Sequence, residues 1–259
     1  MMSQLFDPLL RARRRDRAAR KGAELFLLER AFADCLERLE IMATDWDKVL
    51  LLGCPDPGWR TRVGNLAEAV EVADPGPAFA AAAEGRLIIE DRWTLPENAY
   101  GLILAVGTLD TVDDLPGALR SLASGLRPDG LLIGAMSGGD TLPLLRSAMA
   151  AADHVSGQAA AHVHPRIEAS AVAPLLEQAG LARPVVDVDR VSVSYTSLRR
   201  LAGDLRAMAA TNILVQRSRQ YLGKTGLSAA ESAFAKVAVD GRSVETFEIL
   251  HFAAWKPPR

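Results

Sequence analysis

The chain has 259 residues, of which 49% are hydrophobic and 24% are charged, and its formal net charge at pH 7 is −2. These values are typical of a globular protein with a substantial core, and they exclude a general electrostatic attraction to nucleic acid or to an anionic membrane. Cys35 and Cys54 provide neither a disulfide framework nor a metal-knuckle spacing, and no stretch approaches the ~20 apolar residues of a membrane span. We therefore expect a cytoplasmic protein with no transmembrane segment.

The first predicted element is an N-terminal helical extension over 1–45. It opens with seven basic residues against one acidic residue between Arg11 and Lys21. Such a run serves in some proteins as a nucleic-acid arm, an interfacial helix or a transit peptide. Here it continues directly into the periodic stretch "AELFLLERAFADCLERLE", which favours a solvent-exposed face of the first helix.

Short aliphatic runs that end in glycine or acidic residues predict the strands of a parallel sheet. The first five are expected at 47–53, in a segment ending at 73–74, and at 86–91, 99–110 and 131–138. Amphipathic sequence separates most of them, notably "LPGALRSLASGLRPDG", and this alternation is typical of right-handed crossovers in an open α/β sheet. The framework is therefore predicted to be doubly wound.

The C-terminal half adds helices at 141–155 and 170–181, an edge or sixth strand at 184–195 and a last strand at 244–257. Helical sequence over 196–240 interrupts the sheet pattern between those two strands. We interpret it as a cap inserted into a single domain of residues 1–259. The predicted fold class is thus α/β with a helical cap before the last strand.

Ligands of open parallel sheets lie outside the carboxyl ends of the strands, next to the switch in strand order. The first strand breaks at Gly53 and Cys54 into a turn that reaches Gly58, as in a loop that receives a ligand at a helix start. Asp74 ends the second strand, where an acid can accept both hydroxyls of a ribose. Asp91 ends the third strand, where a carboxylate can accept the amino group of an adenine.

This arrangement resembles the S-adenosylmethionine-dependent methyltransferase fold, a seven-stranded, mostly parallel sheet with an antiparallel last strand. The resemblance implies that S-adenosylmethionine is the cofactor. The residues expected to bind it are Gly53, Cys54, Gly58, Asp74, Asp91 and Val106.

A narrower resemblance lies in stretches outside the cofactor loops. The segments "LFDPLLRARRRDRAA", "GAMSGGDTLPLLR", "DLRAMAATN" and "HFAAWKP" are similar to those of the mitochondrial complex I assembly factors and their bacterial relatives. That family is methyltransferase-like, its mitochondrial members are implicated in arginine hydroxylation, and it is similar to the malonyl-carrier methyltransferases. The resemblance implies a protein substrate, with a respiratory complex I subunit as the candidate, at the cytoplasmic face of the inner membrane.

The first loop departs from the family pattern Asp-Leu-Gly-Cys-Gly-x-Gly. Leu51 replaces the acid, and Pro55 and Pro57 stand where glycines permit close approach. Proline removes a backbone donor and adds ring atoms, so the loop is expected to bind the cofactor less well than its relatives do. The alternative hypothesis is therefore a non-catalytic scaffold or chaperone that keeps the fold and has lost the cofactor.

The candidate catalytic residues are Asp140, His164 and Tyr195. Asp140 lies in a Gly-Gly-Asp-Thr turn after the fifth strand, where it either faces the pocket or caps the next helix. His162 and His164 have the spacing of a metal pair, but no third ligand accompanies them, and no metal is expected. The sequence does not fix the oligomeric state.

Overall fold

The computed structural model describes residues 4–42, 44–157 and 159–258. Its centre is a sheet with the order β3-β2-β1-β4-β5-β7-β6. The strands are β1 (Trp46–Leu52), β2 (Ala67–Asp74), β3 (Arg86–Leu87), β4 (Tyr100–Val106), β5 (Leu126–Ser137), β6 (Ala182–Tyr195) and β7 (Ser243–Trp255). All neighbours pair in parallel except β7, which is antiparallel to both β5 and β6. The predicted fold class is confirmed.

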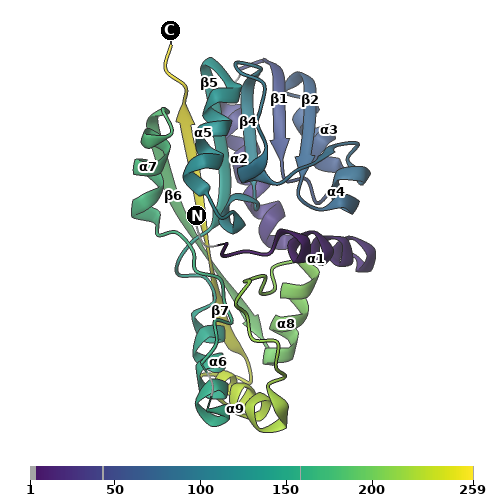
Figure 1. Cartoon of the computed structure of the whole chain (residues 1–259), viewed down its shortest axis with the longest axis vertical. Coiled ribbons are helices and arrows are strands. Elements are labelled where there is room, and N and C mark those ends of the chain that lie inside the picture. Colours follow the sequence, from purple (N-terminus) through teal and green to yellow (C-terminus); the bar gives the residue numbers. More distant parts are fainter. Residues whose placement is uncertain (1–3, 43, 158, 259) are drawn as a thin grey trace.

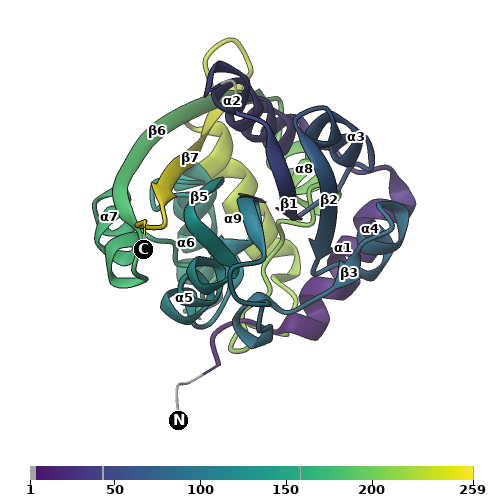
Figure 2. The same cartoon turned by 90° about the horizontal axis from the view of Figure 1, so that it is seen from above.

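Helices cover both faces of the sheet (Figure 2). One face carries α2 (Phe26–Met42) and α3 (Gly58–Gly64), and the other carries α5 (Leu115–Gly125) and α7 (Ala169–Gln178). Along β1 the side chains alternate between these layers: Val49 and Leu51 pack in the core with α2, while Leu50 and Leu52 pack in the core with α5. Burial on both faces explains why the central strands are continuous aliphatic runs.

The third strand is much shorter than predicted. Residues 86–91 were expected to be extended, but β3 has two residues and a 3-10 turn, Glu90–Arg92, follows it. The carboxylates of Glu90 and Asp91 bind groups outside the sheet, Glu90 with Arg11 and Asp91 with backbone N–H groups of the loop before α5. Tertiary contacts therefore draw this segment off the sheet edge.

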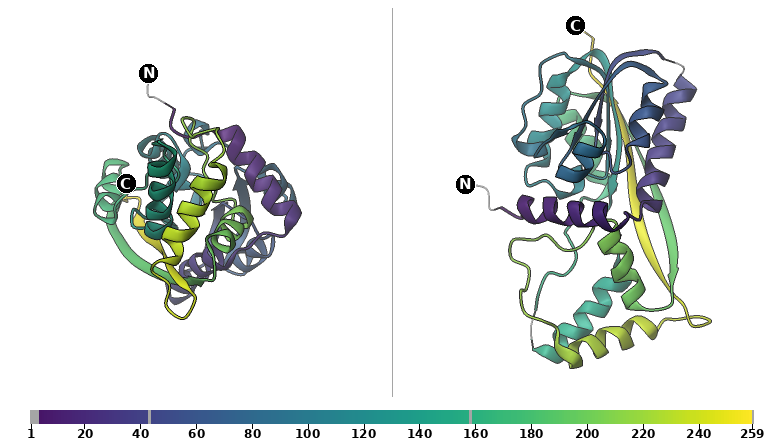
Figure 3. Two further views of the ribbon diagram at one scale, coloured as in Figure 1. Left: turned by 90° about the horizontal axis from the view of Figure 1, so that it is seen from below. Right: turned by 90° about the vertical axis from the view of Figure 1, so that its right-hand side faces the viewer.

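The N-terminal extension consists of two helices. α1 (Pro8–Lys21) ends at Gly22, whose φ of 83° turns the chain before α2 begins. α1 lies across the gap between the sheet and the lower helices (Figure 3). The prediction that its basic run is a solvent-exposed face is wrong for Arg11 and Arg15, which are only 7% and 6% exposed, and holds for Arg13 and Arg20.

The lower part of the molecule is a group of helices beneath the sheet (Figure 1), and it has its own apolar core. The segment predicted as a cap contains α8 (Leu198–Ala207) and α9 (Gly223–Ala235), and α6 (Pro143–Ser156) packs against α9. The far ends of β6 and β7 reach into this core, which includes Tyr195 and Phe247. α4 (Pro77–Ala82) completes the helices and packs against α1.

Among the described residues no helix has both the length and the apolarity to cross a bilayer.

Candidate functional site

The turn after β1 and the end of β2 meet as the sequence predicts. Gly53 has a φ of 87°. Its backbone N–H donates a hydrogen bond to the carbonyl of Ala73 in β2, at 2.8 Å. The backbone N–H of Cys54 then donates to the carboxylate of Asp74, also at 2.8 Å. Burial and the Asp74 charge raise the pKa of the Cys54 thiol to about 12, so this cysteine is not a thiolate at neutral pH.

The carboxylate of Asp74 is fully occupied by protein donors. It accepts hydrogen bonds from Arg15 Nε at 2.9 Å and Nη2 at 2.6 Å, from the Gly76 N–H at 2.6 Å and from the Cys54 N–H. A carboxylate has about four acceptor positions, and these four donors fill them. Asp74 is 0% exposed, so no position remains for the hydroxyls of a ribose.

α1 approaches this turn as closely as its backbone allows. A Cβ placed on Gly76 would lie 2.7 Å from the Cβ of Arg15, which is closer than real Cβ atoms come. Glycine at this position therefore lets the helix, rather than a ligand, sit directly on the end of β2. The guanidinium of Arg15 also lies 5.0 Å from the ring of Phe79 in α4, which holds it in place from the other side.

A second arginine of α1 does the same at the end of β3. Arg11 makes a two-pronged ion pair with Glu90, at 2.8 Å and 2.9 Å, and its Nη2 donates to the Thr108 carbonyl at 2.7 Å. Arg11 and Arg15 are four residues apart, so they lie on one face of the helix and reach two neighbouring strand ends. Both pairs are buried and hydrogen-bonded, which is the geometry in which an ion pair is hard to break.

The other residues expected at the cofactor site lie nearby with different neighbours. Asp91 accepts hydrogen bonds from the backbone N–H groups of Asp113 and Asp114. Gly58 is the first residue of α3, and its N–H donates to Asp56. Val106 ends β4 and is buried against Gly53. The strand ends converge as predicted, but the carboxylates of Asp74 and Asp91 accept their hydrogen bonds from the protein itself.

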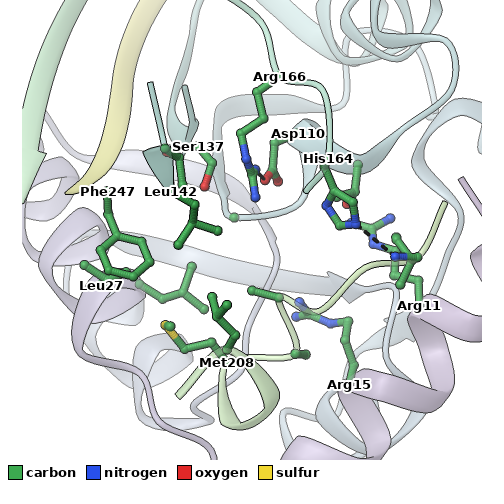
Figure 4. A pocket seen from close by; sticks show the side chains of 18 residues that line it. Arg11, Arg15, Leu27, Asp110, Ser137, Leu142, His164, Arg166, Met208 and Phe247 are labelled. Carbon is green, nitrogen blue, oxygen red and sulfur yellow. Dashed lines mark hydrogen bonds and ion pairs between the residues drawn. The ribbon is translucent and has the colours of Figure 1, made fainter. Parts of the chain in front are cut away.

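A cavity of about 100 Å³ lies between the strand ends and the lower helices. Figure 4 shows its two kinds of wall. The apolar wall is formed by Leu27, Leu142, Met208 and Phe247. The polar wall is formed by Arg11, Arg15, Asp110, His164 and Arg166. Each of these three arginines is paired with an acid, Arg166 with Asp110, so the wall carries little uncompensated charge.

Of the three candidate catalytic residues, His164 lines this cavity. It is buried, and its Nε2 accepts a hydrogen bond from the Ile213 N–H at 2.9 Å, so the imidazole is neutral with its proton on Nδ1. Burial and the charge of Arg166 lower the pKa of His164 to about 4. Such an imidazole is a weak base at neutral pH, and its catalytic role stays a prediction.

Asp140 and Tyr195 lie away from the cavity. The Asp140 side chain is mostly exposed and pairs with Arg190 at 3.2 Å. Tyr195 is buried in the core of the lower helices, where burial and the charge of Asp204 raise the pKa of its phenol above the usual value. The geometry thus brings neither of them to the strand-end site.

The interpretation of Asp140 as the cap of the next helix is wrong. The free N–H groups of Leu144 and Leu145 at the start of α6 donate instead to Glu245 of β7, at 3.2 Å and 2.8 Å. Glu245 is fully buried, and burial raises its pKa while these hydrogen bonds act in the opposite direction. Glu245 lies about a hundred positions from α6 in the sequence, so its role as this cap could not be predicted from local sequence.

The residues around the candidate site that the sequence did not indicate are Arg11, Arg15 and Arg166. The four-residue spacing of Arg11 and Arg15 places both on one face of α1 and could have indicated a shared role. The other basic residues of the run made this spacing hard to recognise. Among the described residues no group of three His, Cys, Asp or Glu side chains is placed to hold a metal ion.

Known proteins place the chain in a family. A malonyl-[acyl-carrier protein] O-methyltransferase of Halorhodospira halophila is 31% identical over 257 residues, which are 93% of this chain and 85% of that protein. The chain belongs to this methyltransferase family. The chain is also similar to the mouse arginine-hydroxylase NDUFAF5, mitochondrial, which is 29% identical over 97% of this chain and 77% of its own length. No family model matches the chain.

The zebrafish arginine-hydroxylase NDUFAF5, mitochondrial, is 35% identical, and the match spans 66% of this chain and 54% of that protein. This chain therefore matches about half the length of that relative. The resemblance to the two groups of proteins is confirmed by these matches.

Solved structures agree on the fold. The YcgJ protein of Bacillus subtilis superposes with a TM-score of 0.59 at 11% identity, over 88% of this chain and 100% of that one. A Haemonchus contortus phosphoethanolamine N-methyltransferase, solved with S-adenosylhomocysteine, gives 0.52 at 13% identity, over 87% of this chain and 52% of that one. The fold is that of S-adenosylmethionine-dependent methyltransferases.

Proposed function

We propose that this chain binds or modifies a protein substrate in the cytoplasm, and that its S-adenosylmethionine site is held closed by α1. The partner that we propose is a subunit of respiratory complex I at the inner membrane face, as the resemblance to the complex I assembly factors implies. The family and the convergence of three strand ends support a cofactor site. The pairing of Arg15 with Asp74 supports its closed state.

Besides its two buried ion pairs, α1 is attached by hydrogen bonds to loops and to α4 rather than to the strands of the sheet. Before the helix, the backbone N–H groups of Leu5 and Phe6 donate to Asp113. In its middle, Asp16 accepts a hydrogen bond from the Ala78 N–H at 2.9 Å. If α1 withdraws, Asp74 loses two of its four donors and its carboxylate becomes available to a ribose. The apparent affinity for the cofactor then equals the affinity of the open form multiplied by the fraction of molecules that are open.

A specific observation supports a second candidate function, a scaffold that no longer binds the cofactor. Pro55 and Pro57 lack the backbone N–H groups that a glycine-rich loop offers a ligand, and Pro55 is buried. In this hypothesis the ion pairs of Arg11 and Arg15 are permanent parts of the fold. The two hypotheses predict opposite effects of loosening α1.

The test is calorimetric titration of the full chain with S-adenosylhomocysteine. Arg15→Ala frees two acceptor positions of Asp74, and we expect the variant to bind at least tenfold more tightly than the unaltered protein. Because Arg15→Ala also leaves a buried carboxylate unpaired, a second variant, Asp16→Ala, loosens α1 without touching the buried pairs. Loss of one hydrogen bond, worth about 1 kcal/mol, predicts binding that is about fivefold tighter.

Arg13→Ala is the matched control, since Arg13 lies on the exposed face of the same helix. Its affinity should equal that of the unaltered protein. Binding by neither folded variant at millimolar ligand would contradict a gated cofactor site and leave the scaffold.

A further inference from the structure

A second, larger cavity lies beneath α1 on the side of the lower helices. Its volume is about 360 Å³, which is in the range of small-molecule sites. It shares a wall with the smaller cavity, formed by Leu142, His164, Arg166, Leu205 and Ala210. Its arginines come from four separate parts of the chain: Arg14 from α1, Arg166 from the segment before α7, Arg206 from α8 and Arg217 from the segment before α9.

The charges at this cavity are almost all of one sign. None of the described residues that line it is an aspartate or a glutamate. Arg166 is neutralised by Asp110, outside the lining, and Arg217 has Asp7 at the longer distance of 3.7 Å. Arg14 donates to uncharged acceptors, the Thr211 hydroxyl and the Asn212 carbonyl. The cavity therefore contrasts with the strand ends, where each arginine has its own carboxylate.

Arg14 lies in an unfavourable electrostatic environment. Burial and the charges of Arg17, Arg217 and Arg206 lower the pKa of its guanidinium. Its Nε is buried and, within the described part of the chain, has no hydrogen-bond partner. A buried donor without a partner and several converging like charges are both unfavourable, and the repulsion between the like charges is relieved when an anion binds.

We propose that this cavity binds a small organic ligand that carries a carboxylate or phosphate group on an apolar chain. Arg14, Arg206 and Arg217 bind the anionic group through charge-assisted hydrogen bonds. Part of the remaining wall, which includes Leu145, Met149 and Leu222, is apolar and suits an alkyl chain. The proposal goes beyond the cofactor question, because it depends on the far side of α1 and on α8 rather than on Asp74.

The test is titration of the full chain with decanoate, decyl phosphate, butyl phosphate and inorganic phosphate, below the concentrations at which the longer ligands form micelles. We expect decanoate or decyl phosphate to bind, and the tighter of the two identifies the anionic group. Butyl phosphate should bind at least fivefold more weakly than decyl phosphate, and inorganic phosphate more weakly still. Decyltrimethylammonium, which has the same chain and the opposite charge, should not bind.

The variants are Arg206→Gln and Arg217→Gln, each of which should weaken binding about tenfold. Arg14→Gln also removes contacts within the fold, so the proposal does not depend on it. Arg219→Gln is the matched control, because Arg219 is exposed and does not line the cavity. Equal losses for Arg219→Gln and Arg217→Gln, equal binding of the cationic ligand, or no binding of any anionic probe at millimolar concentration would overturn the proposal.

These results are separable from those of the cofactor titration. Anion binding can be measured whether or not S-adenosylhomocysteine binds, and Arg206 and Arg217 touch neither Asp74 nor Glu90.

Discussion

The two sides of α1 use the same residue type in opposite ways. Toward the sheet, Arg11 and Arg15 form buried ion pairs with Glu90 and Asp74. Toward the lower helices, Arg14 faces other arginines. An α-helix turns about 100° per residue, so Arg14 and Arg15 cannot face the same wall. The difference shows that arginine content alone does not indicate a binding surface, because what matters is whether an acid lies opposite.

The largest effect is expected from removing a carboxylate on the paired side. Asp74→Ala leaves Arg15 buried without its partner and also removes the acceptor of the Cys54 and Gly76 N–H groups. We expect the free energy of unfolding to fall by about 3–5 kcal/mol, measured by chemical denaturation. Asp187→Ala is the control, because it breaks an ion pair with Arg38 that is largely exposed and should cost less than about 1 kcal/mol. Equal losses would mean that the buried pair does not hold the site closed.

A smaller effect is expected at His164, which lies on the wall that the two cavities share. Its pKa is about 4 in the folded protein, against 6.5 in the unfolded chain. Between these values the unfolded chain binds the proton, so the stabilisation is fully present above pH 6.5 and is lost as the pH falls toward 4. From pH 7 to pH 5 this group should cost up to about 2 kcal/mol of stability.

The measurement is the free energy of unfolding at both pH values for the unaltered protein and for His164→Gln. The variant should lose less stability between pH 7 and pH 5. His154→Gln serves as the control, since His154 is exposed and should leave the pH dependence unchanged. The same pH dependence in all three proteins would show that His164 is not kept neutral by its surroundings.

The smallest effect is expected on the unpaired side. Arg206 lies at the edge of the larger cavity and is exposed, so Arg206→Gln should change the free energy of unfolding by no more than about 0.5 kcal/mol. At low salt the change should be a gain, because the variant removes repulsion with Arg14, and added salt should abolish it. A loss of more than about 1 kcal/mol, set against the roughly 0.5 kcal/mol limit for a surface substitution, would place Arg206 in a structural contact instead.

The strands were predictable because each is a local pattern. The run predicted at 99–110 is apolar up to Gly107, which indicates a buried parallel strand without knowledge of its neighbours. The strand itself is shorter, Tyr100–Val106, because a 3-10 turn at Leu109–Thr111 follows the glycine. Strand 86–91 was predicted too long because Glu90 and Asp91 bind groups that are distant in the sequence. For the same reason the adjacent Asp140, and not Glu245, was considered as a cap of α6.

By itself the sequence determined most strands of the sheet and the meeting of Gly53, Cys54 and Asp74 at one edge, because periodicity follows from local composition. The antiparallel last strand was implied by the resemblance to the methyltransferase fold. Only the tertiary structure decided what lies on that edge. Whether a charged side chain is paired depends on which distant carboxylate the fold brings within 3 Å or so, the range of a charge-assisted hydrogen bond. For Arg15 the fold brings Asp74, and for Arg14 it brings only other arginines and uncharged oxygens.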